Sequence, residues 1–181
     1  TRCKNLIATA KYISNENKGR FPDNYDDILK LKGVGPYTAA AIASFAYNLP
    51  YAVVDGNVFR VLSRFFNDNT AIDSTEGKKI FTVLAQELLD KIQPGIHNQA
   101  LMDFGAVICK PKLPLCRQCA LQSRCGAHLK GLVNVLPVKE KKITQKIRWL
   151  FYFIIEHNSK VYVRKRGTKD IWENLYEFVL V

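Results

Sequence analysis

Apolar residues recur at helical spacing from the start of the chain to about residue 109. Over residues 1–15, Leu6, Ile7, Ala10 and Ile13 share one face, while basic side chains occupy the others. This pattern predicts a helix. The same spacing, with capping residues or proline at helix starts and glycine or proline at helix ends, predicts further helices over 24–31, 36–45, 58–66, 74–92 and 98–109.

The pattern changes after Gly131. Apolar and β-branched residues gather in short stretches bounded by turn-forming residues, which is typical of β-strands. Since two or three strands rarely fold alone, we expect 148–181 to be the front of a second domain, preceded by a basic linker. The predicted strands are 149–155, 161–166 and 178–181, with a turn at 157–159.

Two glycines mark the turn between the second and third predicted helices, in the sequence L-K-G-V-G-P that begins at Leu31. Glycine permits positive φ and close backbone approach. The exposed N–H groups of such a turn and of the helix that follows form an anion site. A plain pair of helices joined by a glycine cap would have the same sequence pattern, so the turn alone leaves both interpretations open.

Four cysteines follow the last predicted helix in the spacing C-x6-C-x2-C-x5-C, with lysines and arginines between them. Four thiolates in so short a stretch suit a tetrahedral metal ion or a [4Fe–4S] cluster. Cys3, the fifth cysteine, stands apart and is expected to be a small buried apolar residue. The clustered residues are Cys109, Cys116, Cys119 and Cys125.

The composition limits the classes of partner that the chain is expected to bind. Its formal net charge is +11 and its apolar fraction is 48%. The charge favours a polyanionic partner over an ordinary solvated surface, and no apolar run is long enough to cross a membrane. Clustered cysteines without a secretory signal indicate metal ligation in a reducing compartment, so we expect a cytoplasmic protein, and the charge favours nucleic acid as its partner.

Three motifs follow one another along the chain: the glycine turn in L-K-G-V-G-P-Y-T-A, the segment V-D-G-N-V that begins at Val54, and the four cysteines. In this order and at these separations they resemble the helix–hairpin–helix DNA glycosylases that carry an iron–sulfur cluster. The V-D-G-N-V segment, followed by R-V-L, is similar to the adenine glycosylases of the MutY family. The resemblance covers about residues 1–128 and continues more weakly to the end.

This resemblance implies a mainly α fold: a partial six-helix barrel with an iron–sulfur cluster loop, followed by the first strands of a Nudix-like α/β domain. Residues 1–95 would be the barrel remainder, with the helix–hairpin–helix at about 24–46. Residues 96–130 would hold the last helix and the cluster loop, 131–147 the linker, and 148–181 the Nudix-like start.

The resemblance also assigns active-site residues. Asp55 matches the catalytic aspartate, whose carboxylate would stabilise the positive charge that develops on deoxyribose as the base leaves. A second role, as the N-cap of the following helix, is equally sound physically. Asn57 and Tyr37 match supporting positions. Tyr37 stands where bifunctional relatives carry a Schiff-base lysine, so a monofunctional glycosylase is expected.

The resemblance further implies double-stranded DNA containing an adenine mispair as the partner, base flipping before reaction, and a monomer. It favours a [4Fe–4S] cluster over zinc, because only Cys116 and Cys119 form a zinc-like C-x2-C pair. The expected DNA contacts are Gly33, Val34, Gly35, Thr38, Lys110, Lys112, Arg117 and Arg124.

The implied activity is hydrolysis of the N-glycosidic bond of adenine opposite 8-oxoguanine or guanine. The family's general-acid glutamate lies upstream of Thr1 in this comparison, so we expect an N-terminally truncated fragment with little or no activity. Two alternatives remain: an endonuclease III-type glycosylase/lyase acting on oxidised pyrimidines, and a non-catalytic DNA-binding helix–hairpin–helix module.

Overall fold

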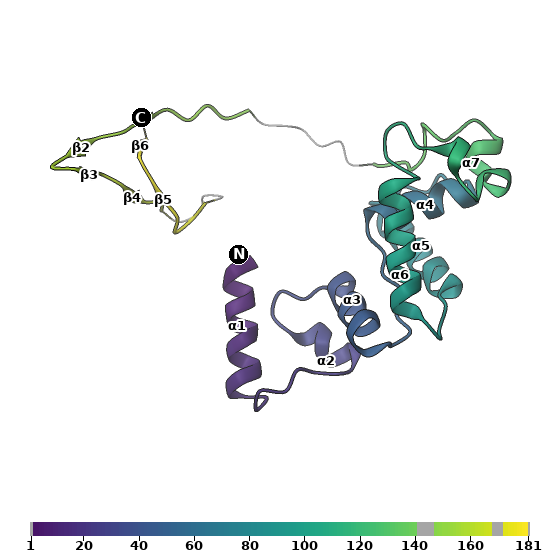
Figure 1. Ribbon diagram of the computed structural model, residues 1–181, viewed down its shortest axis with the longest axis horizontal. Helices are drawn as coiled ribbons and strands as arrows, with labels where there is room; N and C mark the ends of the chain where they lie inside the picture. The colour runs from purple at the N-terminus through teal and green to yellow at the C-terminus, as the bar shows by residue number, and fades with distance from the viewer. Residues whose placement is uncertain (1, 141–146, 168–171, 181) are drawn as a thin grey trace. The chain divides into compact units, whose positions relative to one another are not determined.

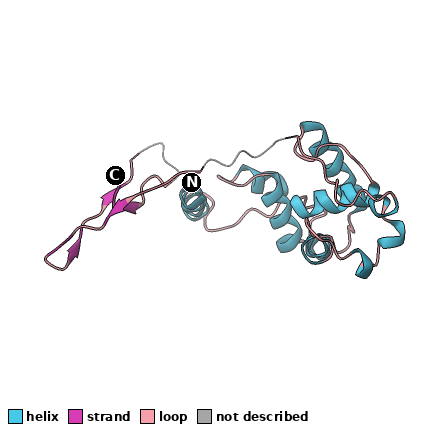
Figure 2. Cartoon of the chain, turned by 90° about the horizontal axis from the view of Figure 1, so that it is seen from above, coloured by secondary structure: helices cyan, strands magenta, loops and turns pink. Residues whose placement is uncertain are grey.

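The computed structural model describes residues 2–140, 147–167 and 172–180. The chain divides into a helical unit, Thr1–Lys142, and a strand unit, Ile143–Val181. Figure 2 shows that the helices belong to the first unit and the strands to the second. No helix among the described residues has the length and apolar character required to cross a bilayer.

The first five helices of this unit begin within two residues of the positions that the sequence predicts. Asn24 caps α2 by accepting from the Asp27 N–H at 3.0 Å, and Ser74 caps α5 by accepting from the Gly77 N–H at 2.9 Å. Pro36 occupies the first turn of α3. The helices are α1 (Arg2–Asn15), α2 (Tyr25–Lys30), α3 (Pro36–Tyr47), α4 (Gly56–Phe66), α5 (Thr75–Leu88), α6 (Pro94–Val107) and α7 (Gly126–Leu129).

The predicted boundary between the fifth and sixth helices is wrong. The sequence pattern carried the fifth helix to residue 92 and started the sixth at 98, whereas α5 ends at Leu88 and α6 begins at Pro94. Asp90 forms the intervening turn by accepting from two backbone N–H groups, and Pro94, which lacks an N–H, fits a first helical position rather than a stop.

Two small cores hold the helical unit together. One lies between α4 and α5 and includes Val58, Leu62 and Phe81, all at most 3% exposed. The other packs α2 against α3 around Ile28. Helix α6 packs against α3 and α4, and α7 packs against α4 (Figure 1). Helix α4 therefore contacts three other helices, which makes it the centre of this unit.

The strand unit contains shorter strands than the sequence predicts. Two residues of the predicted first strand pair with two of the third, while the next two pairs form separate ribbons. Asn158 and Ser159 both have positive φ, which suits a tight hairpin turn. The pairs are β1 (Tyr152–Phe153) with β6 (Val179–Leu180), β2 (Glu156–His157) with β3 (Lys160–Val161), and β4 (Arg164–Lys165) with β5 (Tyr176–Glu177).

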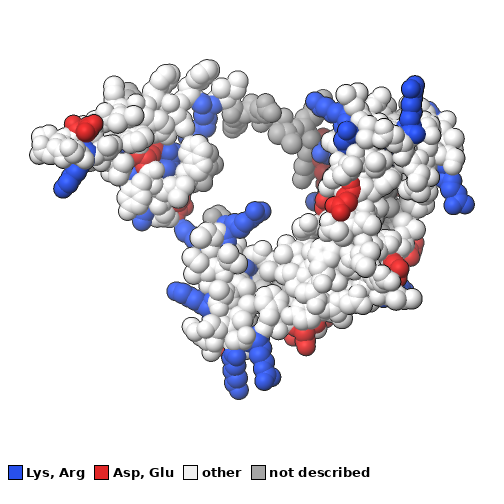
Figure 3. All heavy atoms as spheres, viewed as in Figure 1, with Lys and Arg blue, Asp and Glu red and all other residues white. Residues whose placement is uncertain are grey.

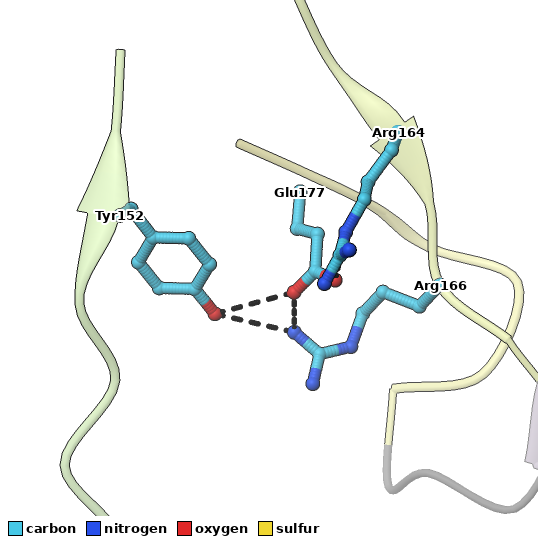
Figure 4. Close-up of polar contacts among 4 residues, drawn as sticks. All are labelled: Tyr152, Arg164, Arg166 and Glu177. Carbon is cyan, nitrogen blue, oxygen red and sulfur yellow. Dashed lines mark hydrogen bonds and ion pairs between the residues drawn. The ribbon is translucent and has the colours of Figure 1, made fainter. Parts of the chain in front are cut away.

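A buried ion pair connects these short strands. The Arg166 guanidinium donates to the Glu177 carboxylate and to the Tyr152 hydroxyl, while Arg164 donates to the other oxygen of Glu177 (Figure 4). Trp172 packs over the Arg166 guanidinium at 4.9 Å. These contacts tie β1, β4 and β5 together where the backbone pairing is brief. Residues 141–146 of the predicted linker and Val181 of the predicted third strand lie outside the described residues.

Candidate active site and cysteine centre

The segment that leads into α4 is held by a buried asparagine of α6. Asn98 accepts from the Val53 N–H at 3.0 Å and donates to the Tyr51 carbonyl at 2.9 Å and to the Ser44 hydroxyl at 3.0 Å. Asn98 is 1% exposed, so these bonds are shielded from water and hold the chain firmly. They fix the backbone two residues ahead of Asp55.

Asp55 is the N-cap of α4. Its Oδ1 atom accepts from the backbone N–H groups of Asn57 and Val58, each at 2.8 Å, and its Oδ2 atom accepts from the Asn57 side-chain amide at 2.8 Å. Three donors therefore fix the orientation of the carboxylate at the positive end of a helix. Asp55 also lines an open groove of about 370 Å³. The capping role is established, and it leaves the carboxylate at the wall of a cavity.

Arg60 extends the series of hydrogen bonds from Asp55 and Asn57 into the interior of the protein. It donates to the Asn57 side-chain oxygen at 2.8 Å, to the Gly105 carbonyl of α6 at 2.8 Å and to the Cys109 carbonyl at 2.7 Å. Burial lowers the pKa of Arg60 from its usual value, although the guanidinium remains charged. One arginine thus connects the partner of Asp55 to the first cysteine of the cysteine loop.

The four clustered cysteines line one small cavity of about 30 Å³, together with apolar residues of α4 and α6. Burial, followed by the neighbouring thiols, raises the pKa of the Cys116 thiol. Four thiolates in this setting would repel one another, so a cationic centre between them would stabilise the arrangement. Among the described residues, no three or more His, Cys, Asp or Glu side chains are arranged as a metal-ion site. The donor set nevertheless suits a group with four sulfur ligands.

Arg64 links the cysteine loop and the segment at Leu136 to α4. It is 2% exposed and donates to the Cys109 sulfur at 3.4 Å, the Lys110 carbonyl at 2.8 Å and the Leu136 carbonyl at 2.9 Å. The sequence comparison did not assign a role to Arg64. Its signal in the sequence is the placement of two arginines four residues apart in a helix whose other buried positions are apolar except for Ser63.

The hairpin turn has the geometry that its glycines predict. Gly33 has φ of +86°, and a Cβ atom there would lie 2.6 Å from the Cβ of Asn5 in α1. Thr9 of α1 also donates to the Lys32 carbonyl at 2.9 Å. The turn is therefore packed closely against α1. Gly33, Val34 and Thr38 line a groove of about 610 Å³, and Gly35 is the N-cap of α3.

The predicted basic contacts lie at the surface of the cysteine loop. Lys112, Arg117 and Arg124 are exposed, and Lys110 is half-buried. Figure 3 shows lysine and arginine side chains projecting from the helical unit in several separate groups, with mostly uncharged surface between them in this view. On the face shown, the cationic side chains of this unit are therefore distributed rather than gathered into one strip.

Tyr37 lies in the first turn of α3 and is 48% exposed. It is not among the described residues that line the groove at Asp55. The structure thus brings Asp55 and Asn57 together and leaves Tyr37 on another helix. The groove has a second wall that the sequence comparison missed, formed by residues that follow the cysteine loop.

Comparison with known proteins agrees with this architecture. Residues 18–45 match the helix-hairpin-helix motif family. A thermostable thymine-DNA glycosylase has a TM-score of 0.65 and 35% identity, covering 71% of this chain and 59% of that one. An endonuclease III in a non-covalent DNA complex has a TM-score of 0.59 and 26% identity, covering 71% of this chain and 58% of that one. The fold is that of the helix–hairpin–helix DNA glycosylases.

Sequence relatives narrow the class. An adenine DNA glycosylase of Buchnera aphidicola is 35% identical over 98% of this chain and 50% of its own length. Those of Schizosaccharomyces pombe and Homo sapiens are 39% and 41% identical over 71% of this chain, covering 28% and 24% of their own lengths. The chain belongs to the adenine DNA glycosylase, or MutY, family. It spans about half the length of the Buchnera relative.

Proposed function

We propose that this protein takes part in DNA repair as a monofunctional adenine DNA glycosylase, which hydrolyses the N-glycosidic bond of adenine paired with 8-oxoguanine or guanine. The observation that carries the proposal is the Asp55 carboxylate. Three hydrogen bonds orient it at the wall of a 370 Å³ groove, in a chain whose relatives are adenine DNA glycosylases.

The proposed chemistry follows from the charge that develops on the sugar. As the base leaves, C1′ of deoxyribose becomes cationic, and a fixed carboxylate lowers the energy of that state. Asp55 would supply the negative charge that stabilises this cation, and it would orient the attacking water. Asn57 would hold the carboxylate in place through its amide. The target nucleotide must leave the duplex to reach the groove.

The proposed monofunctional character depends on Tyr37. A lyase reaction needs an amine that forms an imine with the sugar aldehyde, and a phenol cannot do so. We assign Tyr37 a supporting position near the sugar. Its exposure on α3 leaves it accessible to DNA that approaches the hairpin. This residue favours the glycosylase over the glycosylase/lyase alternative.

We propose that Cys109, Cys116, Cys119 and Cys125 hold a [4Fe–4S] cluster, with zinc as the alternative. Bound iron would neutralise the four thiolates and cross-link the loop. Base excision transfers no electrons, so the proposed role is structural. Arg64 would hold Cys109 in place through its hydrogen bond to the sulfur.

For DNA we propose two sets of backbone contacts, made by a monomer. The N–H groups of the hairpin turn, with Thr38, would bind a phosphate as a helix N-terminus does. The cationic side chains of the cysteine loop would add further phosphate contacts. The strand unit would be the first part of a Nudix-like domain that faces the base opposite adenine. The loop residues are Lys110, Lys112, Arg117 and Arg124.

The substitution Asp55→Asn tests the catalytic assignment. Asparagine caps helices about as well as aspartate, so the variant is expected to keep its fold. Adenine release should fall by about 10²-fold or more because the negative charge is lost. The measurement is single-turnover cleavage of a duplex with adenine opposite 8-oxoguanine by the full-length protein, alongside thermal unfolding. Undiminished release by the folded variant would contradict the proposal.

A further inference from the structure

The second wall of the groove at Asp55 comes from residues 134–140, which we call the strap. The strap follows the cysteine loop and α7 in the chain. Its groove-lining residues are 134–137 and Lys139, and they face Asp55, Gly56, Asn57 and Arg60 across the same 370 Å³ space.

The strap is fastened on both sides of Lys139. The Val138 carbonyl accepts from the Ile72 N–H at 3.0 Å, and the Glu140 N–H donates to the Asp73 carboxylate at 2.9 Å. Leu136 is 3% exposed and its carbonyl accepts from Arg64 at 2.9 Å. The backbone of Lys139 is therefore fixed at the rim of the groove, although its side chain is exposed.

The charges in the groove distinguish Lys139 from the two arginines that also line it. Arg60 and Arg64 are 8% and 2% exposed, and their donors bond mainly to backbone carbonyls. Lys139 is the exposed cation among the described lining residues. Its charge is therefore available to an anionic ligand that enters the groove.

The proposed substrate has such an anion beside its reacting carbon. The deoxyribose that faces Asp55 carries a phosphodiester on its 3′ side and another on its 5′ side. Each phosphate is repelled by the Asp55 carboxylate, which must stay anionic to stabilise the sugar cation. A cation fixed at the rim of the same groove offsets this repulsion and holds the strand in register.

We propose that the strap is a part of the DNA-binding site and that Lys139 binds a backbone phosphate flanking the extruded nucleotide. This inference rests on the proposed function, because it takes the DNA strand as the occupant of the groove. It assigns the substrate contact to a segment that follows the cysteine loop, in addition to the hairpin and the loop itself.

The first test compares Lys139→Ala with Lys79→Ala, a matched loss of charge at an exposed lysine of α5 that lines a different groove. The probe is a fluorescent duplex with adenine opposite 8-oxoguanine, titrated at several salt concentrations. Lys139→Ala should bind about threefold to tenfold more weakly. Its plot of log K against log salt should be less steep, with the negative slope smaller in magnitude by about 0.9. Lys79→Ala should match the wild type, and Lys139→Arg should restore binding.

The second test locates the phosphate with a methylphosphonate, which is neutral, placed on either side of the target adenosine. At the contacted phosphate, the neutral linkage should weaken binding by the wild type but weaken Lys139→Ala no further. Equal losses from both proteins at both positions would overturn the contact, as would a salt slope in Lys139→Ala equal to that of Lys79→Ala.

Different results would exclude the proposed activity and the Lys139 contact. If the full-length wild-type protein binds the duplex but releases no adenine, the proposed activity fails while the phosphate contact still stands or falls on the Lys139 comparison. If adenine release is normal and Lys139→Ala behaves as Lys79→Ala does, the inference alone fails. If the wild-type protein does not bind the duplex, both the proposed activity and the Lys139 contact are excluded.

Discussion

At the scale of single residues, the site depends on polar side chains that the sequence pattern would place in a core. Arg60 and Arg64 project from the same side of α4 into an environment made mostly of backbone carbonyls. Each arginine carries several donors in a rigid plane, so one side chain can satisfy carbonyls from separate segments. These contacts join the helix that begins at Asp55 to the cysteine loop and the strap.

Removing Arg64 should therefore unfasten both segments. In Arg64→Leu, the Leu136 and Lys110 carbonyls would remain buried without their donor, and the free energy of unfolding should fall by about 2 kcal/mol or more. Chemical denaturation measures this. Arg117→Leu, at an exposed position of the cysteine loop, is the control and should change stability by about 0.5 kcal/mol or less. Equal stability of the two variants would contradict the proposed fastening.

Asp90 provides a residue-scale prediction about pH. Hydrogen bonds from the Ile92 and Gln93 N–H groups lower its pKa below the ordinary value of 3.8. A depressed carboxyl pKa stabilises the folded state above the unfolded pKa, and this stabilisation is lost as pH falls through the folded value. Asp90→Asn, whose amide oxygen still accepts but does not titrate, should lose less stability than the wild type below about pH 4. Parallel loss in both proteins would argue against the assignment.

At the scale of elements, the close approach of α4 and α6 positions the site. A Cβ atom at Gly105 would lie 2.6 Å from the Cβ of Asn57, which holds the Asp55 carboxylate. Glycine is therefore required here for contact between two helices rather than for a turn. Helical spacing predicts each helix, but the distance between two helices depends on the side chains at their crossing.

Gly105→Ala should separate the two helices at the level of Asn57. The expected loss of stability is about 1–3 kcal/mol, and adenine release should fall because Asn57 and Asp55 are displaced together. Thermal unfolding and single-turnover cleavage measure the two effects. Gly56→Ala, where a Cβ atom would meet nothing within 4 Å, is the stability control and should keep or increase stability. An unchanged Gly105→Ala protein would show that the contact relaxes without cost.

At the scale of the whole molecule, several segments of the helical unit meet at the cysteine cavity. Residues of α4, α6 and the loop line this cavity, and α7 with the strap continues from it along α4. A centre bound there would link segments far apart in the sequence. It would stabilise the unit because the four thiolates converge only in the folded chain, so that binding favours the folded state. The strand unit contains none of these cysteines and should not depend on the centre.

The substitution Cys116→Ser tests this dependence. It should lower bound iron and the absorbance at about 400 nm that marks an iron–sulfur cluster, and it should lower the unfolding temperature of the helical unit. Cys3→Ser is the matched control, because Cys3 is exposed on α1 and does not line the cavity. Iron analysis, zinc analysis and calorimetry make the comparison. Stoichiometric zinc in place of iron would refute the cluster.

The exposed position of Cys3 also corrects the sequence expectation that it is buried. Its neighbours suggest an apolar helix face, but whether that face is covered depends on which elements pack against α1.

The dependence on tertiary packing also explains the start of α6. Periodicity shows which residues can share a face, while Asp90 and Pro94 acquire their roles only from the turn that the tertiary fold requires.

The sequence by itself determined helices α1 to α4, the capping of α2 and α5, the glycine turn and the ordered motifs that indicate a glycosylase. These features depend on contacts within a few residues, so local spacing is sufficient to predict them. The tertiary structure alone decided that Arg60 and Arg64 connect Asp55, the cysteine loop and the strap, and that Lys139 shares a groove with Asp55. The hydrogen bonds of the two arginines to α6, the cysteine loop and the strap join residues separated by 45 to 72 positions, and Lys139 follows Asp55 by 84. Packing in three dimensions, rather than sequence periodicity, brings these residues together.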